Sequence, residues 1–156
     1  MFDLTRCHFP SHASLGFKKA FELSKLSGKV MLESVKPDEV RISAKRHQLF
    51  YFPGYEPDVG MIKAVAAGSG AFVISVSDLL RVGGASRAVL ISKMKTFLML
   101  CVKYRAKYVV CSLARDEFET RSARELVAIG ELLGLGYEQA CAAVERLGEI
   151  LGEKSG

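Results

Sequence analysis

The sequence has little of what marks a membrane protein, a disulfide-rich protein or a zinc protein. Its apolar runs are cut by Lys, Arg, Ser or Gly before they reach the roughly 20 residues that a membrane-spanning helix needs. No basic-then-apolar signal pattern opens the chain. Only four cysteines are present, without a C-x-x-C pair, so neither a zinc knuckle nor a disulfide framework is indicated. We therefore expect a soluble, cytoplasmic protein in which Cys101, Cys111 and Cys141 are small buried hydrophobes.

The motifs of self-contained enzymes are also missing. Gly68-Ser69-Gly70 and Gly83-Gly84 match neither a dinucleotide fingerprint nor a P-loop, and there is no G-x-S-x-G elbow. No carboxylate pair stands out as an acid–base couple. Cys7, His8 and His12 could be imagined as metal ligands, but Pro10 disfavours the helix that would bring the two histidines together. We therefore predict no catalytic residue, no metal site and no cofactor bound by the protein.

Acidic residues are absent from one long segment, residues 79–115. The whole chain holds 22 Lys and Arg against 17 Asp and Glu, so the part outside this segment is slightly acidic. Concentrated positive charge on an otherwise ordinary domain is typical of a protein that binds nucleic acid or another polyanion. The usual pairing of Glu with Lys one helical turn away is impossible within the segment. Its basic residues are Arg81, Arg87, Lys93, Lys95, Lys103, Arg105, Lys107 and Arg115.

The apolar pattern predicts alternating strands and helices. At 156 residues and 49% hydrophobic composition, the chain can form one domain with a substantial core. Residues 37–45 are ambiguous between helix and strand, residues 79–84 are expected to be a loop, and Ser86 is expected to cap the helix that follows. Ser122 and Glu125 form an S-x-x-E capping box. The predicted strands are residues 2–6, 29–35, 48–52, 71–76 and 107–112, and the predicted helices are residues 15–26, 58–67, 86–104, 122–133 and 137–151.

This alternation predicts a mostly parallel α/β sheet covered by helices. A full eight-unit barrel needs about 250 residues, so this chain has room for five or six strand–helix units. We expect an incomplete or shortened TIM-like (β/α) barrel, with a doubly wound sheet as the alternative. We detect no linker or repeat, and we therefore predict a single domain over residues 1–156.

Polar residues follow two neighbouring predicted strands. In a parallel sheet, the carboxyl ends of the strands form the edge where ligands usually bind. Ser77-Asp78 and residues 79–84 follow one strand, and residues 112–121 follow the next, so both stretches should lie at this edge. They could bind phosphate. Alternatively, Ser77 and Ser112 only cap turns.

From about Pro57 onward, an ordered series of short motifs resembles ribonuclease P protein component 3, the α/β-barrel protein subunit of archaeal and eukaryotic ribonuclease P. The family's hallmark is Arg-x-Pro-Arg-Asp/Glu-Leu before a helix that ends in a Leu-Gly step. The matching pieces are Phe72-Val-Ile-Ser-Val-Ser-Asp-Leu-Leu80, Ser86-Arg87-Ala88, Lys103-Tyr104, Val109-Val-Cys-Ser-Leu-Ala114, Arg121-Ser-Ala-Arg-Glu-Leu126 and Gly130-Glu-Leu-Leu-Gly-Leu135.

The resemblance covers about residues 57–153, and it leaves residues 1–56 as an N-terminal part that is shorter than the family norm. Ala123 stands where the family has proline. Related barrel phosphoesterases begin with an Asp-x-His-x-His metal motif. The matching stretch here is Asp3-Leu-Thr5-Arg-Cys7, which has neither histidine. This departure disfavours the alternative function, a stand-alone, metal-dependent, barrel-like phosphoesterase.

The resemblance implies a function in tRNA processing. The chain would be a subunit of the ribonuclease P ribonucleoprotein, an endoribonuclease (hydrolase) that removes the 5′ leader from precursor tRNA. The RNA would carry the catalysis, with Mg²⁺ expected for that reaction. The implied partners are ribonuclease P RNA, precursor tRNA and a small ferredoxin-like subunit, component two, in a heterotetramer without membrane contact.

Basic side chains would then neutralise RNA phosphates and stabilise the active RNA fold. Arg121 and Arg124 add cations at the start of a helix, where backbone N–H groups also attract phosphate. Glu125 matches an acidic position of the family, but we interpret it first as a helix cap. The predicted RNA-binding residues are Lys103, Arg121 and Arg124, followed by Arg87, Arg105, Lys107 and Arg115.

Overall fold

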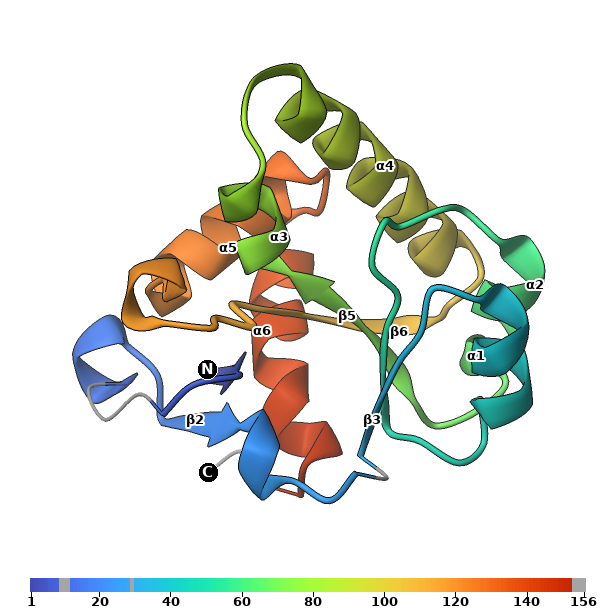
Figure 1. Ribbon diagram of the computed structural model, residues 1–156, viewed down its shortest axis with the longest axis horizontal. Helices are drawn as coiled ribbons and strands as arrows, with labels where there is room; N and C mark the ends of the chain where they lie inside the picture. Colours follow the sequence, from blue (N-terminus) through green and yellow to red (C-terminus); the bar gives the residue numbers. More distant parts are fainter. Residues whose placement is uncertain (9–11, 29, 153–156) are drawn as a thin grey trace.

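A four-stranded parallel sheet forms the centre of the protein (Figure 1). The computed structural model describes residues 1–8, 12–28 and 30–152. The strands lie in the order β3 (Met31–Glu33), β4 (Leu49–Tyr51), β5 (Ala71–Ser75) and β6 (Lys107–Cys111). Every neighbouring pair is parallel. The four strands predicted between residues 29 and 112 are therefore confirmed. β4, β5 and β6 are one or two residues shorter than predicted, whereas β3 has three of the seven predicted residues, of which residue 29 lies outside the described part of the chain.

A second sheet consists of two parallel strands, β1 (Phe2–Thr5) and β2 (Lys19–Glu22). β1 was predicted, but the helix predicted over residues 15–26 is wrong. Gly16 has a φ of 82°, a left-handed conformation that a right-handed helix cannot contain. Pairing with β1 then takes residues 19–22 into a strand, so tertiary pairing overrides the local helical pattern of apolar residues.

The two sheets meet where β1 and β6 end. The Leu113 amide donates to the Leu4 carbonyl at 2.8 Å, and the Arg6 amide donates to the Ala114 carbonyl at 2.7 Å. The strands therefore follow one another around the protein in chain order, as in a (β/α) barrel, with an opening between β2 and β3. The connection across this opening spans only residues 23–30, with the short 3₁₀ helix η2 (Leu23–Lys25), whereas a parallel crossover needs a dozen residues or more. The fold is thus a shortened TIM-like barrel, as predicted.

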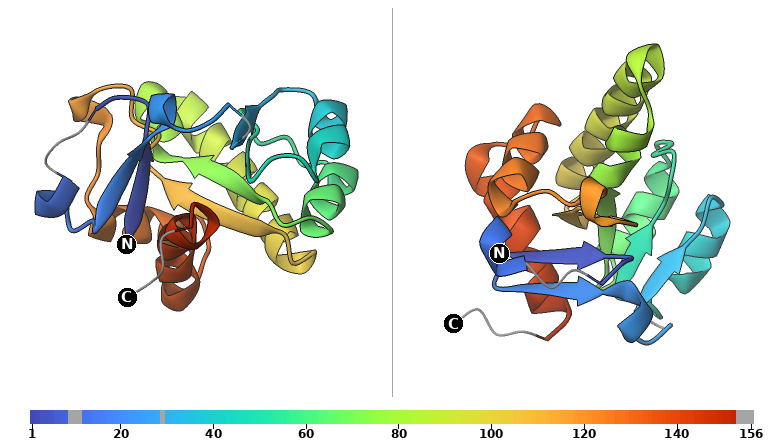
Figure 2. Two further views of the ribbon diagram at one scale, coloured as in Figure 1. Left: turned by 90° about the horizontal axis from the view of Figure 1, so that it is seen from below. Right: turned by 60° about the vertical axis from the view of Figure 1, so that its left-hand side comes forward.

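The helices cover the outside of this open barrel. Figure 1 shows α5 and α6 near the two-stranded sheet, and α1 and α2 beside β3; Figure 2 shows the same elements from two further sides. The ambiguous residues 37–45 form a helix that begins at proline, as Pro at the first helical position favours. The helices are α1 (Pro37–Ser43), α2 (Val59–Ala66), α3 (Val76–Arg81), α4 (Gly84–Lys103), α5 (Ala123–Leu132) and α6 (Tyr137–Ile150), with 3₁₀ helices η1 (His12–Leu15) and η3 (Glu117–Glu119).

Two predictions about helix starts are wrong and one is confirmed. Residues 79–81 belong to α3 rather than to a loop, because the chain turns into a helix directly after β5. α4 begins at Gly84 with Gly83 as its N-cap, so Ser86 is not the cap. The capping box of α5 is present: the Ser122 side chain accepts from the Glu125 amide, and the Glu125 carboxylate accepts from the Ser122 amide.

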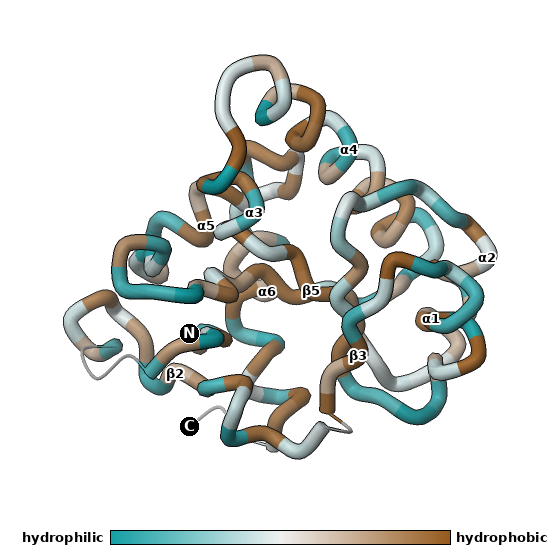
Figure 3. The backbone as a smooth tube through the Cα atoms, viewed as in Figure 1, coloured by the Kyte–Doolittle hydropathy of each residue, from teal (hydrophilic) through white to brown (hydrophobic). Residues whose placement is uncertain are grey.

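The hydrophobic core lies between the sheet and the helices. All five residues of β5 are buried, and this strand is hydrophobic in Figure 3. The apolar residues Met94, Phe97, Leu98 and Cys101, spaced so that they share one face of α4, are buried. Cys111 is buried too, whereas Cys141 is only partly buried. Among the described residues, no helix is both long enough and apolar enough to cross a membrane.

Helix α6 packs closely against β1 because it carries a glycine at the contact. A Cβ atom built on Gly148 would lie 2.4 Å from the Phe2 ring, which is itself buried. No side chain fits at this distance without moving the ring or the helix. Gly148 therefore fixes the approach of α6 to the two-stranded sheet.

We predict that Gly148→Ala lowers the free energy of unfolding by about 1–3 kcal/mol, the usual cost of overpacking a filled core. Gly28→Ala is the matched control, because a Cβ atom there would meet nothing within 4 Å. Urea unfolding of both variants checks this. Equal stability of the two variants would show that α6 moves away from Phe2 without cost.

A buried carboxylate joins the two sheets. Asp3, in β1, is 2% exposed. It accepts a hydrogen bond from the Ser112 amide at 2.7 Å and another from the Ser112 hydroxyl at 2.6 Å. Burial raises the pKa of Asp3 to about 6, although these hydrogen bonds oppose the rise. The folded protein therefore binds this proton more tightly than the unfolded chain does.

A raised pKa in the folded state means that stability is gained as the pH falls from about 7 towards 4. We predict that the free energy of unfolding of the wild-type protein rises over this range by up to about 3 kcal/mol relative to Asp3→Asn, at 1.36 kcal/mol per pKa unit. Asn keeps the shape and can still pair with Ser112, but it does not titrate. Parallel pH profiles for the two proteins would contradict the prediction.

Candidate nucleic-acid interface

The carboxyl ends of the strands, where barrel enzymes place their chemistry, carry a closed network of polar side chains. Tyr51 and Tyr55 both donate from their hydroxyls to the Asp78 carboxylate, at 2.8 and 2.9 Å. The Tyr55 hydroxyl also accepts from the Ser75 amide at 2.9 Å. Burial, together with the charge of Asp78, raises the pKa of both tyrosines above the ordinary value. Both tyrosines therefore remain neutral donors at physiological pH.

Two ion pairs extend this network across neighbouring loops. Arg81 binds Glu119 through two hydrogen bonds of 2.8 and 2.7 Å, and this contact with Arg81 lowers the pKa of Glu119 to about 2. Arg6, which follows β1, pairs with Glu33 at the end of β3 at 2.8 Å. The Arg6 guanidinium also lies 5.7 Å from the centre of the Tyr51 ring. Charges at this end of the barrel are largely neutralised within the chain.

The serines considered for phosphate binding at this edge serve the fold instead. Ser77 and Ser112 are both fully buried. The Ser77 hydroxyl donates to the Leu113 carbonyl at 3.1 Å, and Ser112 binds Asp3 as described above. Neither hydroxyl is open to an external phosphate. The contacts of Ser77 and Ser112 therefore favour the second of the two predicted roles, in which these serines stabilise the turns after the strands.

No metal-binding geometry is found where related barrels have one. In the part of the chain that the structure describes, no three His, Cys, Asp or Glu side chains are grouped so that they could hold a metal ion. Thr5, which takes the place of a histidine in the phosphoesterase motif, is buried and donates to the Cys7 carbonyl at 2.8 Å. These positions stabilise the chain after β1.

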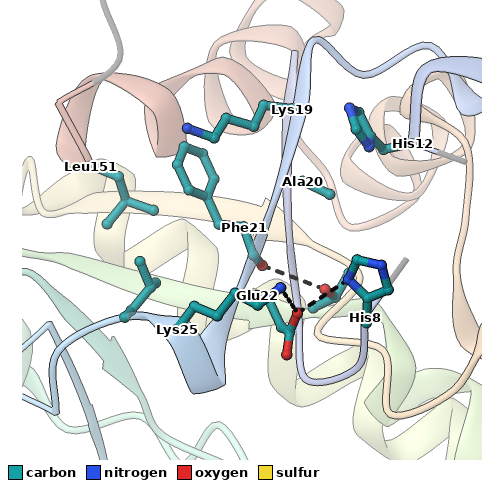
Figure 4. Close-up of a pocket in the computed structure, with 10 residues that line it drawn as sticks. His8, His12, Lys19, Ala20, Phe21, Glu22, Lys25 and Leu151 are labelled. Carbon is teal, nitrogen blue, oxygen red and sulfur yellow. Dashed lines mark hydrogen bonds and ion pairs between the residues drawn. The ribbon is translucent and has the colours of Figure 1, made fainter. Parts of the chain in front are cut away.

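A pocket of about 400 Å³ lies along the outer side of β2 (Figure 4). His8 points to Glu22, with 3.4 Å between Nδ1 and Oε2, while His12 lies apart from this pair. Lys25 also pairs with Glu22, at 2.8 Å. Because Lys25 already pairs with this carboxylate and the two histidines do not converge, the described residues of the pocket do not form a metal site.

The opposite end of the four-stranded sheet is strongly basic. Three short turns, residues 44–48, 66–70 and 103–107, lead into β4, β5 and β6, and we refer to them together as the amino-terminal rim. None of these turns contains Asp or Glu. Lys63, in the last turn of α2, lies beside this rim. The basic residues of the rim are Lys45, Arg46, Lys103, Arg105 and Lys107, all exposed.

The loops after the strands have the opposite balance. We refer to residues 34–36, 52–58, 76–83 and 112–122 as the carboxyl-terminal rim. Its acidic residues are Glu56, Asp58, Asp78, Asp116, Glu117 and Glu119, and its basic residues are Lys36, Arg81, Arg115 and Arg121. The sheet therefore separates a basic rim from a mixed rim with more acids than bases, and a polyanion is attracted to the basic one.

The seven predicted RNA-binding residues divide between these two ends. Lys103, Arg105 and Lys107 lie on the amino-terminal rim. Arg87 lies in the first turn of α4, roughly 24 Å from Lys103 along the helix axis at 1.5 Å per residue. The structure therefore does not bring all seven residues into one cluster. The residues at or near the carboxyl-terminal rim are Arg87, Arg115, Arg121 and Arg124.

Arg87, Arg121 and Arg124 differ in what they contact. The Arg121 guanidinium donates to the carbonyls of Phe118 and Thr120, at 2.9 and 2.6 Å. Arg87 donates to the Val82 carbonyl at 2.7 Å. Arg124 is exposed on α5 beside a small pocket that Glu131 and Tyr137 also line. Arg121 is thus partly occupied within the chain, although its remaining N–H groups are still available.

Long-range ion pairs reduce the free charge of the basic segment. Arg81 pairs with Glu119, and Lys93 pairs with Glu56, so two of the segment's eight cations are neutralised by acids from outside it. No other basic residue of the segment forms an ion pair with a described residue. The other six basic residues therefore keep charges that no acid of the described chain neutralises by an ion pair.

Sequence reasoning missed the basic residues that precede β4 and β5. Lys45, Arg46 and Lys63 lie far from the basic segment in the chain, but the parallel topology brings them to the same rim. The signal was present: each turn before a predicted strand contains no acid, whereas most loops after the strands do. Grouping turns by strand end, rather than by position along the chain, would have found them.

Arg105 occupies a position where glycine is favoured. It ends α4 with a φ of 58°, and the Ala106 amide donates to the Cys101 carbonyl at 2.9 Å in a Schellman motif. The same motif ends α5, and there the residue is Gly134, with a φ of 99°. A non-glycine residue in this conformation costs roughly 1 kcal/mol. Glycine at position 105 would therefore end the helix with less backbone strain than Arg105 does.

Comparison with known proteins identifies relatives for this fold and sequence. No protein-family model matches the chain. Ribonuclease P protein component 3 of Methanosarcina acetivorans is 32% identical over 108 residues, which are 67% of this chain and 45% of that protein. The protein of the same name from Methanosarcina mazei is 30% identical over 103 residues, covering 64% of this chain and 43% of that protein. The chain thus spans less than half the length of these curated relatives.

The fold has a solved counterpart. A chain in the cryo-EM structure of archaeal ribonuclease P with mature tRNA superposes with a TM-score of 0.72 at 16% sequence identity. The superposition covers 80% of this chain and 57% of that chain. At this identity the likeness concerns the fold, and it agrees with the open barrel described above. By sequence, the chain is a homologue of the proteins named ribonuclease P protein component 3, as its ordered motifs predicted.

Proposed function

We propose that this chain is a protein subunit of the ribonuclease P ribonucleoprotein, where it binds and stabilises the RNA during removal of the 5′ leader from precursor tRNA. The observation that carries the proposal is the 32% identity over 108 residues to a protein named ribonuclease P protein component 3. Ribonuclease P RNA and precursor tRNA are the proposed partners. Catalysis, and the Mg²⁺ it needs, belong to the RNA.

The charge distribution supports an RNA-binding role. Lys103, Arg105 and Lys107 are exposed on a turn that contains no acid, and none of them forms an ion pair with a described residue, so their charges are available to phosphates. Each phosphate neutralised by a cation releases condensed counterions, which makes binding favourable and dependent on salt. Such contacts would hold the RNA in its active fold without reading its sequence. The carboxyl-terminal rim, with its paired charges, is less suited to this task.

A protein partner is also part of the proposal. Interfaces between proteins are enriched in exposed Met and aromatic side chains at their centres. Met99 and Val102 on α4 are 62% and 43% exposed, and they line a groove of about 320 Å³ beside Leu135. This apolar surface would suit the small ferredoxin-like component two, in a cytoplasmic heterotetramer.

We predict that the chain raises leader cleavage when it is added to ribonuclease P RNA and component two near physiological salt, and that it is inactive alone. Lys103→Gln with Lys107→Gln should weaken RNA binding. The slope of log affinity against log salt should become shallower by about 1.4–1.8, because each lost phosphate contact removes roughly 0.7–0.9. Cleavage assays and salt titrations measure both effects.

The matched control is Lys25→Gln with Lys36→Gln. Both lysines are exposed and already paired with acids, at 2.8 and 3.5 Å, so removing them changes the net charge equally without removing a free cation. We expect the control to retain the wild-type affinity and slope. If the wild-type chain leaves cleavage unchanged, or cleaves precursor tRNA alone, the proposed function is wrong.

A further inference from the structure

A polar pocket opens at the amino-terminal rim, where barrel proteins do not usually place a ligand site. Its volume is about 280 Å³. Gln48 and Lys107 line it from the turns before β4 and β6, and Ser69 lines it from the turn before β5. It is completed by side chains of α6, which are Arg146, Glu149 and Ile150. Three strand starts and one helix thus converge on a single concave site.

The cations of this pocket are suitably placed for a phosphate. Arg146 donates one hydrogen bond to the Tyr108 carbonyl at 2.7 Å, and its guanidinium lies 5.3 Å from the centre of the Tyr108 ring. These contacts fix the direction of the side chain but leave most of its N–H groups free. Lys107 is exposed and forms no ion pair within the described part of the chain. Two cations from different elements, Lys107 and Arg146, therefore line one small pocket, and both form strong charge-assisted hydrogen bonds with phosphate groups.

Two uncharged polar side chains of the pocket, Gln48 and Ser69, can form hydrogen bonds with a ligand. The Gln48 side-chain amide and the Ser69 hydroxyl belong to exposed residues, and neither forms a hydrogen bond within the part of the chain that the structure describes. An amide and a hydroxyl are the groups that hydrogen-bond ribose hydroxyls and base edges. Glu149 adds an acceptor for an amino or imino group of a base. The pocket therefore offers cations, donors and acceptors together.

More cations continue the rim on both sides of the pocket. Lys45 and Arg46 precede Gln48 by three and two residues, and Arg105 precedes Lys107 by two residues. The ammonium groups of Lys63 and Lys103 lie 5.0 and 5.6 Å from the centre of the Tyr104 ring. A polyanion laid along this rim meets cations before, at and after the pocket. This arrangement fits a strand with successive phosphates better than it fits an isolated small molecule.

We propose that this pocket receives one nucleotide of a single-stranded RNA segment, whose backbone follows the amino-terminal rim. Lys107 and Arg146 hold the phosphate, and Gln48 with Ser69 contacts the ribose or the base. The pocket is near the lower limit of ligand sites, about 300 Å³, so it admits one nucleotide and not several. Bases within an RNA duplex cannot be splayed into such a site. The proposal rests on the RNA-binding function proposed above and adds a defined site to it.

The test uses the full-length chain with a fluorescein-labelled RNA decamer, either single-stranded or in a duplex, and measures anisotropy at several salt concentrations. We expect the single strand to bind more tightly than the duplex. Gln48→Ala changes no charge, so it should weaken single-strand binding about fivefold, the loss of one net hydrogen bond, and leave duplex binding unchanged. Lys107→Gln should weaken binding to both and make the salt slope of single-strand binding shallower by about 0.7.

Arg105→Gly separates function from folding. Glycine relieves the left-handed backbone at this position, so the melting temperature should stay the same or rise while the affinity for the single strand falls and the salt slope becomes shallower. Lys36→Gln, on the opposite rim, makes the same change of charge and should bind as the wild type does. A melting temperature that is retained shows that weaker binding reflects a lost contact rather than unfolding.

The outcomes distinguish the two proposals. Equal affinity for single strand and duplex, with no effect of Gln48→Ala, would overturn the nucleotide pocket and leave the proposed function intact as electrostatic binding. Unchanged binding in Lys107→Gln and Arg105→Gly would also overturn it. If the wild-type chain binds neither RNA and leaves leader cleavage unchanged in the reconstituted particle, the proposed function fails together with the pocket.

Discussion

The hydrogen bonds between the ends of β1 and β6 hold the fold together as one open barrel. Without the Asp3–Ser112 contact and the neighbouring backbone bonds, the two-stranded sheet would have no backbone link to the four-stranded one. The connection between β2 and β3 is too short for a parallel crossover, so β2 and β3 do not pair and the barrel stays open between them. The backbone hydrogen bonds between the two sheets therefore lie at this seam, and α6 packs beneath it through Gly148. A buried, titrating carboxylate at the seam makes the stability of the whole fold depend on pH.

The parallel arrangement of the strands also places two kinds of connection at opposite ends of the sheet. Every turn that enters a strand lies at one end and every loop that leaves a strand lies at the other. In this chain the leaving loops carry paired charges, such as Arg81 with Glu119, and the turns that enter β4 and β6 carry cations that form no ion pair with the described residues. An enzyme of this class would use the carboxyl-terminal rim. Here several polar side chains of that rim bind one another, as Tyr51 and Tyr55 bind Asp78, and the basic surface lies at the opposite end.

Local patterns predicted much of this structure, and tertiary contacts account for the rest. Buried strands such as β5, the apolar face of α4 and the capping box of α5 depend on near neighbours in the chain, so the sequence was sufficient to predict them. β2 depends on pairing with β1, and its apolar residues also fit a helical period. The pairing of Arg81 with Glu119, the left-handed Arg105 and the convergence of Lys45 with Lys107 required the three-dimensional arrangement. The sequence therefore predicted Lys103, Arg105 and Lys107 as part of one basic segment. It did not predict that Lys45, Arg46 and Lys63 join them at the same rim.

The most direct test of this account is a lysine footprint of the chain with and without ribonuclease P RNA, using an acetylating reagent and mass spectrometry. The account predicts that the RNA protects Lys45, Lys63, Lys103 and Lys107, which belong to or adjoin the amino-terminal rim. Lys25 and Lys36, which lie beyond the carboxyl ends of β2 and β3, should react equally in both states. Protection of Lys25 and Lys36, with the rim lysines left reactive, would contradict the assignment of the RNA-binding face.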